Sequence, residues 1–123
     1  MAEFSFQEPL YLALGQEIYQ QHTKDQGNAV SILSDAMATL RQLGLIGLDL
    51  WIDSKSGERI FIREAINKGT TAERLGLAHR LQSIEERKKT QPREENMDAA
   101  WNEMENLMRV LRYAKYYAKT QDD

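Results

Sequence analysis

The stretch from residue 48 to residue 63 constrains the fold more than any other part of this sequence. Apolar and polar residues alternate on both sides of a Ser-Lys-Ser-Gly cluster. Alternation interrupted by a short polar cluster is typical of two antiparallel strands joined by a tight turn. We therefore predict a β-hairpin over residues 48–63, with Gly57 in the left-handed conformation that a three-residue loop needs.

The register of this hairpin pairs side chains across the two strands. The expected pairs are Trp51 with Phe61, Asp49 with Arg63 and Asp53 with Arg59. Each pair contributes roughly 0.2 to 1 kcal/mol, and the aliphatic opposite face must be covered because a two-stranded hairpin is barely stable alone. The predicted fold class is α+β and mainly helical: a single domain, residues 1–123, of about four helices and one wing-like hairpin.

Helix signals flank the hairpin on both sides. The spacing of apolar residues predicts helices over residues 9–22, 28–43 and 70–89, and another after Pro92. Pro9 suits a first helical turn, Asn28 suits an N-cap, and Gly44 suits a left-handed helix end. Thr70 begins a capping-box pattern. Whether residues 28–43 form one helix or two is left open.

The last helix has the clearest periodicity in the chain. Apolar residues recur in steps of four and three, the spacing of a helix-packing seam. The seam residues are Met97, Trp101, Met104, Met108 and Leu111. We expect this helix to pack against the body of the protein or against a second copy of the chain.

The amino-acid composition limits the kinds of chemistry that this chain can perform. The chain has no cysteine, and its two histidines, His22 and His79, lie in different predicted elements, so no metal-binding pattern is present. The glycines form no phosphate-binding loop. We expect a non-enzymatic protein without metal or cofactor. The net charge of -3 gives no global attraction to phosphates, and no apolar run has the length of a membrane span, so a cytoplasmic location is expected.

Residues 39–46, Thr-Leu-Arg-Gln-Leu-Gly-Leu-Ile, precede the predicted hairpin, and Glu-Ala-Ile-Asn-Lys-Gly follows it. Over residues 34–78 this order resembles winged-helix transcriptional regulators of the PadR and MarR type. The resemblance implies a recognition helix ending at Leu43, a two-stranded wing and a dimerising helix. The nucleic-acid contacts that it implies are Ser34, Asp35, Ala38, Thr39, Arg41 and Gln42 on the helix, and Lys55 and Arg59 on the wing.

The sequence leaves two functions open. The first, implied by this resemblance, is a regulator that binds double-stranded DNA as a homodimer. The second is an acidic protein-interaction module, an inhibitor or an accessory subunit. Its expected partner-binding residues are Trp51, Phe61, Trp101, Met104, Met108 and Leu111. Residues 40–55 and 101–118 also resemble the small helical subunit of type III CRISPR effector complexes, an all-helical family, which implies helix in place of the hairpin.

Basic residues gather in two groups. One comprises Arg80, Arg87, Lys88, Lys89 and Arg93, and the other comprises Arg109, Arg112, Lys115 and Lys119. The second group recurs in steps of three and four, so it lies along one side of the last helix. It forms either a solvated face or, with Tyr113, Tyr116 and Tyr117, a stripe that tracks a nucleic-acid backbone, because aromatic rings beside cations can stack on bases.

Overall fold

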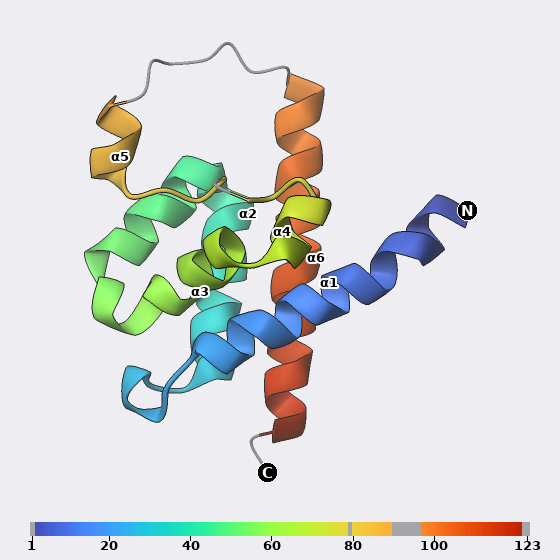
Figure 1. Ribbon diagram of the computed structural model, residues 1–123. Helices are drawn as coiled ribbons and strands as arrows, with labels where there is room; N and C mark the ends of the chain where they lie inside the picture. The colour runs from blue at the N-terminus through green and yellow to red at the C-terminus, as the bar shows by residue number, and fades with distance from the viewer. Residues whose placement is uncertain (1, 79, 90–96, 122–123) are drawn as a thin grey trace.

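The computed structural model describes residues 2–78, 80–89 and 97–121, and these residues contain helices and no strand (Figure 1). The elements in chain order are α1 (Ala2–Gln21), the 3-10 helix η1 (Lys24–Gln26), α2 (Ala29–Ser54), α3 (Ser56–Lys68), α4 (Thr70–Arg74), α5 (Ile84–Lys89) and α6 (Met97–Gln121). The predicted α+β class is therefore wrong, and the fold of the described residues is helical. Pro92 and Arg93 lie outside them.

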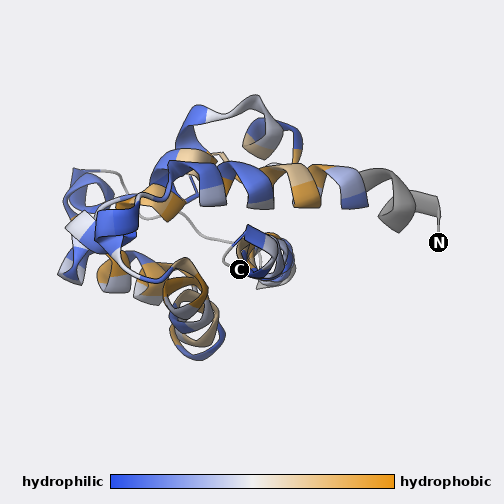
Figure 2. Ribbon diagram, turned by 90° about the horizontal axis from the view of Figure 1, so that it is seen from below, coloured by the Kyte–Doolittle hydropathy of each residue, from blue (hydrophilic) through white to orange (hydrophobic). Residues whose placement is uncertain are grey.

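The fold is built around α6, which packs against both α1 and α2, while α3 packs against the same two helices. Figure 2 looks along α6 and shows α1 lying across it. The crossing is close at Gly15, where an added Cβ would lie 2.7 Å from the backbone nitrogen of Ala114. Glycine on α1 and a small residue on α6 thus let the two backbones approach.

The predicted hairpin is a helical hairpin instead. Residues 48–54 belong to α2, Lys55 makes the turn, and α3 follows at once. A short apolar run fits a strand and a buried helix equally well, and the contacts here follow the helical spacing. Leu48 and Ile52 are buried while Leu50 between them is exposed. Gly57 lies in α3 and does not have the positive φ that the predicted loop required.

Two of the sequence predictions for α2 are confirmed. Asn28 is its N-cap, with the side chain accepting a hydrogen bond of 2.9 Å from the Ser31 N–H. Gly44 has a φ of 74° and breaks the helix, as predicted, but a second helical segment follows it. Leu43 folds over Gly47 across this break, where a Cβ would lie only 2.1 Å from the Leu43 Cβ.

The other predicted helix boundaries need correction. α1 begins well before Pro9, so this proline lies inside the helix rather than in its first turn. Residues 70–89 do not form one helix: α4 ends at Arg74, and Gly76 turns the chain with a φ of 73°. The predicted capping box is wrong too, because the N-cap of α4 is Gly69 and no side chain caps it.

The buried face of α6 differs from the predicted seam. Its buried residues among those described are Leu107, Val110, Leu111, Ala114 and Ala118. Of the predicted seam only Leu111 is fully buried, whereas Met104 and Met108 pack at the edge of the core and Trp101 is 58% exposed. The Met97 side chain lies outside the described residues. The face is displaced because small residues at 114 and 118 allow the close approach of the neighbouring helices.

Candidate functional site

The predicted DNA-reading residues lie on a structure that has no wing among its described residues. Arg41 and Gln42 are exposed on α2, and Thr39 uses its hydroxyl to donate to the Asp35 carbonyl of its own helix at 2.8 Å. Ser34 is half-buried, and Asp35 and Ala38 are exposed on the same helix.

The two residues assigned to the wing lie at the turn between α2 and α3. Lys55 is exposed at this turn. Arg59 stacks over Trp51, with 4.0 Å from its guanidinium carbon to the ring centroid, and donates to the Trp51 carbonyl at 2.5 Å. Arg59 therefore stabilises the turn between the two helices. It does not lie on a β-strand, where the resemblance implied a DNA contact.

The predicted partner-binding residues differ in exposure: Phe61 and Leu111 are buried, while Trp51, Met104 and Met108 are half-buried. Phe61 is buried and packs edge-on against His22, with 5.0 Å between the ring centroids. Trp51 is half-buried beneath Arg59, and Leu111 is in the core. The predicted Trp51–Phe61 pair does not form, because the two rings face different neighbours. Only Trp101 among these aromatic residues lies well exposed.

A buried ion network joins α2, α3 and α5. Asp49 is fully buried and accepts hydrogen bonds from Arg63 at 3.2 Å, from the Arg87 Nε at 2.8 Å and from the Gln82 N–H at 3.1 Å. Arg63 also pairs with Asp53 at 2.9 Å. The predicted Asp49–Arg63 pair thus exists, but between two helices. Burial raises the pKa of Asp49, while the bonds from Arg87 and Arg63 oppose that rise.

This network is structural. It attaches the segment after α4 to the helical hairpin, since the backbone of Gln82, the Arg87 side chain and the Ile84 N–H all meet Asp49 or Asp53. Sequence reasoning missed the role of Arg87, which lies 38 positions from Asp49. The available signal was Asp49 within an apolar stretch, because charged residues are buried only when paired, but nothing in the charged run around Arg87 identified it as the partner.

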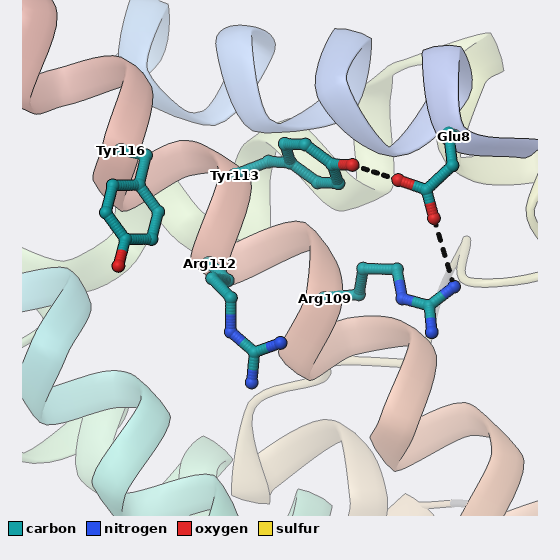
Figure 3. Close-up of a pocket in the computed structure, with 5 residues that line it drawn as sticks. All are labelled: Glu8, Arg109, Arg112, Tyr113 and Tyr116. Carbon is teal, nitrogen blue, oxygen red and sulfur yellow. Dashed lines mark hydrogen bonds and ion pairs between the residues drawn. The ribbon is translucent and has the colours of Figure 1, made fainter.

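A hollow of about 350 Å³ lies between α1 and α6 (Figure 3). It is lined by Glu8, Arg109, Arg112, Tyr113 and Tyr116. Glu8 comes from α1 and the other four from α6, so the close crossing of these helices creates the site. The volume falls within the range of small-ligand sites.

Glu8 organises one end of the hollow. One carboxylate oxygen accepts from the Arg109 guanidinium at 3.2 Å, and the other accepts a short hydrogen bond from the Tyr113 hydroxyl. Arg109 also lies over the Tyr11 ring, 5.3 Å from its centroid. The hydrogen bond to Glu8 is the main cause that raises the pKa of the Tyr113 phenol, and burial of the phenol is the second. The Tyr113 ring and the Arg109 fork are thereby held in fixed positions.

The other end of the hollow is open and basic. Arg112 and Tyr116 are both exposed, and the Lys119 ammonium lies 5.0 Å from the centroid of the Tyr116 ring. Figure 3 shows the Arg112 side chain extending away from Glu8. This is part of the stripe that the sequence offered as an alternative. Tyr117 is not part of it, because its ring packs edge-on against Tyr19 of α1 at 5.6 Å.

Other chemistries receive no support from the geometry. The described residues contain no group of three side chains able to hold a metal ion. Within the same ranges, no helix combines the length and the apolar character needed to span a membrane.

Comparisons with known proteins add no family assignment. No protein-family model matches the chain, and neither a curated protein nor a solved structure is significantly similar to it.

Proposed function

We propose that this chain is a non-catalytic protein that binds single-stranded nucleic acid through the second half of α6. The contact surface, here termed the α6 cationic face, consists of Arg112, Lys115, Tyr116 and Lys119. The cations would bind phosphates, and the exposed Tyr116 ring would stack on a base.

One observation carries this proposal: residues 108–121 contain four basic residues and no acidic one, in a chain whose net charge is -3. The segment therefore carries a local positive charge in a chain that is acidic overall. Tyr116, which is 57% exposed, lies among these cations. Cationic side chains that follow a strand and aromatic rings that stack on its bases are the usual means of binding unpaired nucleic acid.

An unpaired strand fits this surface better than a duplex. Stacking on a side chain requires bases that are free of their neighbours, and a duplex does not offer them. The duplex-reading geometry implied by the winged-helix resemblance needed a wing, and residues 48–63 are helical. The exposed ring of Tyr116 therefore favours single-stranded RNA or DNA as the ligand class.

The direct test is fluorescence anisotropy with a labelled single-stranded oligonucleotide at several salt concentrations. Counterion release lowers the logarithm of the affinity by about 0.7 per phosphate contact for each unit in the logarithm of salt. Three contacts then weaken binding roughly 20-fold between 50 and 200 mM salt. Replacing Arg112, Lys115 and Lys119 together by alanine should reduce the slope of this dependence by about 2.

The matched control removes the same charge elsewhere. Lys24, Lys68 and Lys88 are exposed on η1, α3 and α5, and their triple replacement by alanine should leave most of the affinity intact. Equal losses in the two triple variants would mean that only net charge matters and would refute the α6 cationic face. A duplex that binds more tightly than either of its separated strands would refute the choice of an unpaired ligand.

A second candidate function rests on a different surface. Leu43, Ile46 and Leu50 of α2 are 67%, 58% and 53% exposed and lie on both sides of the break at Gly44. We propose self-association through these exposed apolar side chains as the alternative role. Light scattering behind a sizing column would show a mass near twice 14.2 kDa, and Leu50→Ser should lower it. A monomer at all concentrations would rule this out.

A further inference from the structure

The hollow between α1 and α6 contains a carboxylate that a purely phosphate-binding surface does not need. Glu8 neutralises Arg109, so this end of the hollow has no net positive charge to attract a phosphate. A group that donates hydrogen bonds and presents a flat ring would be favoured there instead, since an ionised carboxylate only accepts hydrogen bonds.

We propose that this hollow is a binding pocket for one guanine base, which gives the single-strand binding proposed above a preference for guanosine. Glu8 would accept hydrogen bonds from the Watson–Crick edge of the base. The Tyr113 ring would stack on it. Arg112 would bind an adjacent phosphate. This inference rests on the proposed function and adds to it a specificity-determining residue.

The geometry of Tyr113 connects stacking with edge recognition. Its hydroxyl already donates to one Glu8 oxygen, so the hydroxyl end of the ring points at the carboxylate (Figure 3). A base that stacks on the face of this ring consequently has its own edge beside Glu8. Each carboxylate oxygen has a second lone-pair site, so the bonds from Arg109 and Tyr113 leave capacity for the base.

The donor pattern of the bases selects guanine. On its Watson–Crick edge guanine presents two adjacent donors, the N1–H and the N2 amino group, which match the two oxygens of one carboxylate. Adenine and cytosine present an amino group next to an acceptor nitrogen, and uracil presents one N–H between two carbonyls. An acceptor atom opposite Glu8 is repelled, so only guanine makes a bidentate contact.

The pocket is held in place before any ligand arrives. Arg109 is fixed by Glu8 and by the Tyr11 ring, and Tyr11 itself donates to Asn106 at 2.9 Å. A preorganised pocket loses less conformational entropy on binding than a mobile one. The hollow is also open at the Arg112 end, which lets the backbone of the strand continue along α6 toward Lys119.

The test uses the full chain and four heptanucleotide RNAs, which are uridine at every position except the central one. The central base is guanine, hypoxanthine, adenine or uracil. Hypoxanthine is guanine without the N2 amino group, so it isolates one of the two proposed hydrogen bonds. A bidentate base contact discriminates by roughly 5- to 150-fold. We expect the guanosine strand to bind about tenfold more tightly than the all-uridine strand, with the inosine strand between them.

Glu8→Gln is the decisive variant. Its amide offers one acceptor and one donor, so the guanosine-to-uridine affinity ratio should fall to about one. Glu85→Gln makes the same charge change on α5, where the Glu85 side chain is 80% exposed, and it should keep the ratio of the unaltered chain. Circular dichroism verifies that both variants fold.

The outcomes separate this inference from the proposed function. Binding of all four strands with equal affinity would overturn the guanine pocket and leave single-strand binding standing. A guanosine preference that survives Glu8→Gln, or that inosine matches in full, would overturn the assignment of Glu8 to the Watson–Crick edge. The absence of binding to any strand at low salt would overturn the proposed function, and the pocket with it.

Discussion

Replacing Asp49 by asparagine should destabilise the protein strongly, because this residue is the centre of the buried ion network. The change keeps the size of the side chain, so it opens no cavity. It removes the negative charge that faces Arg63 and Arg87, and it can turn the amide NH₂ group toward one of these donors. The Arg63 side chain is only 8% exposed and cannot recover its hydration.

The magnitude follows from burial. Removing one partner of a buried ion pair costs about 3 to 5 kcal/mol. Arg63 keeps its pair with Asp53, and Arg87 is 28% exposed and can turn toward water, which favours the lower end, about 3 kcal/mol. A chain of this length has an unfolding entropy of about 0.26 kcal/mol/K, so the melting temperature should fall by about 12 °C. The total stability expected for 123 residues is about 6 to 18 kcal/mol.

Urea unfolding followed by circular dichroism measures this loss, and hydrogen exchange locates it. The Gln82 amide donates to Asp49, so its exchange should accelerate in the variant more than that of the α6 core amides. The control is Glu64→Gln, which breaks the exposed pair with Lys68 and should cost less than about 1 kcal/mol. A loss for Asp49→Asn no larger than that of the control would refute the argument that this network holds the segment after α4.

Two further predictions concern the α1–α6 contact. Gly15→Ala should lower the free energy of unfolding in urea by about 1 to 3 kcal/mol, because its Cβ would meet the Ala114 backbone. Gly57→Ala, with open space around it, should raise that free energy by about 0.4 to 1 kcal/mol. Equal effects of the two substitutions would refute the close crossing. The pKa of Tyr113 is raised by its bond to Glu8, so this bond stabilises the fold fully below the ordinary tyrosine pKa of about 10 and is lost as the pH rises through the folded value. An NMR titration should show that Glu8→Gln lowers this pKa, and an unchanged value would contradict the assigned cause.

The sequence predicted those features that depend on local chemistry. Asn28 caps α2 because its side chain reaches an N–H three residues ahead, and Gly44 breaks the same helix because glycine tolerates positive φ. The last helix was predicted from its periodicity. For the candidate site, helical spacing alone placed the basic residues of α6 on one side, and a nucleic-acid stripe with the tyrosines was one of two interpretations of that side.

Residues 48–63 show where local reasoning fails. Alternation over two short segments satisfied a strand pattern, and the same residues satisfied a helical one. The choice between them depends on what covers Leu48, Ile52 and Phe61, which is a tertiary matter. The Asp49–Arg63 pair was expected across a β-hairpin and forms between two helices instead, and its third partner, Arg87, comes from a distant segment.

The sequence by itself determined the start of α2 at Asn28, its break at Gly44 and the side of α6 that carries charge, because each depends on atoms within a few residues. Only the tertiary structure decided which apolar residues of α6 are buried, that Tyr117 turns inward, and that Glu8 meets Arg109 and Tyr113. Glu8 and Arg109 are 101 positions apart. No local spacing encodes such a contact, and the crossing of α1 over α6 at Gly15 creates it.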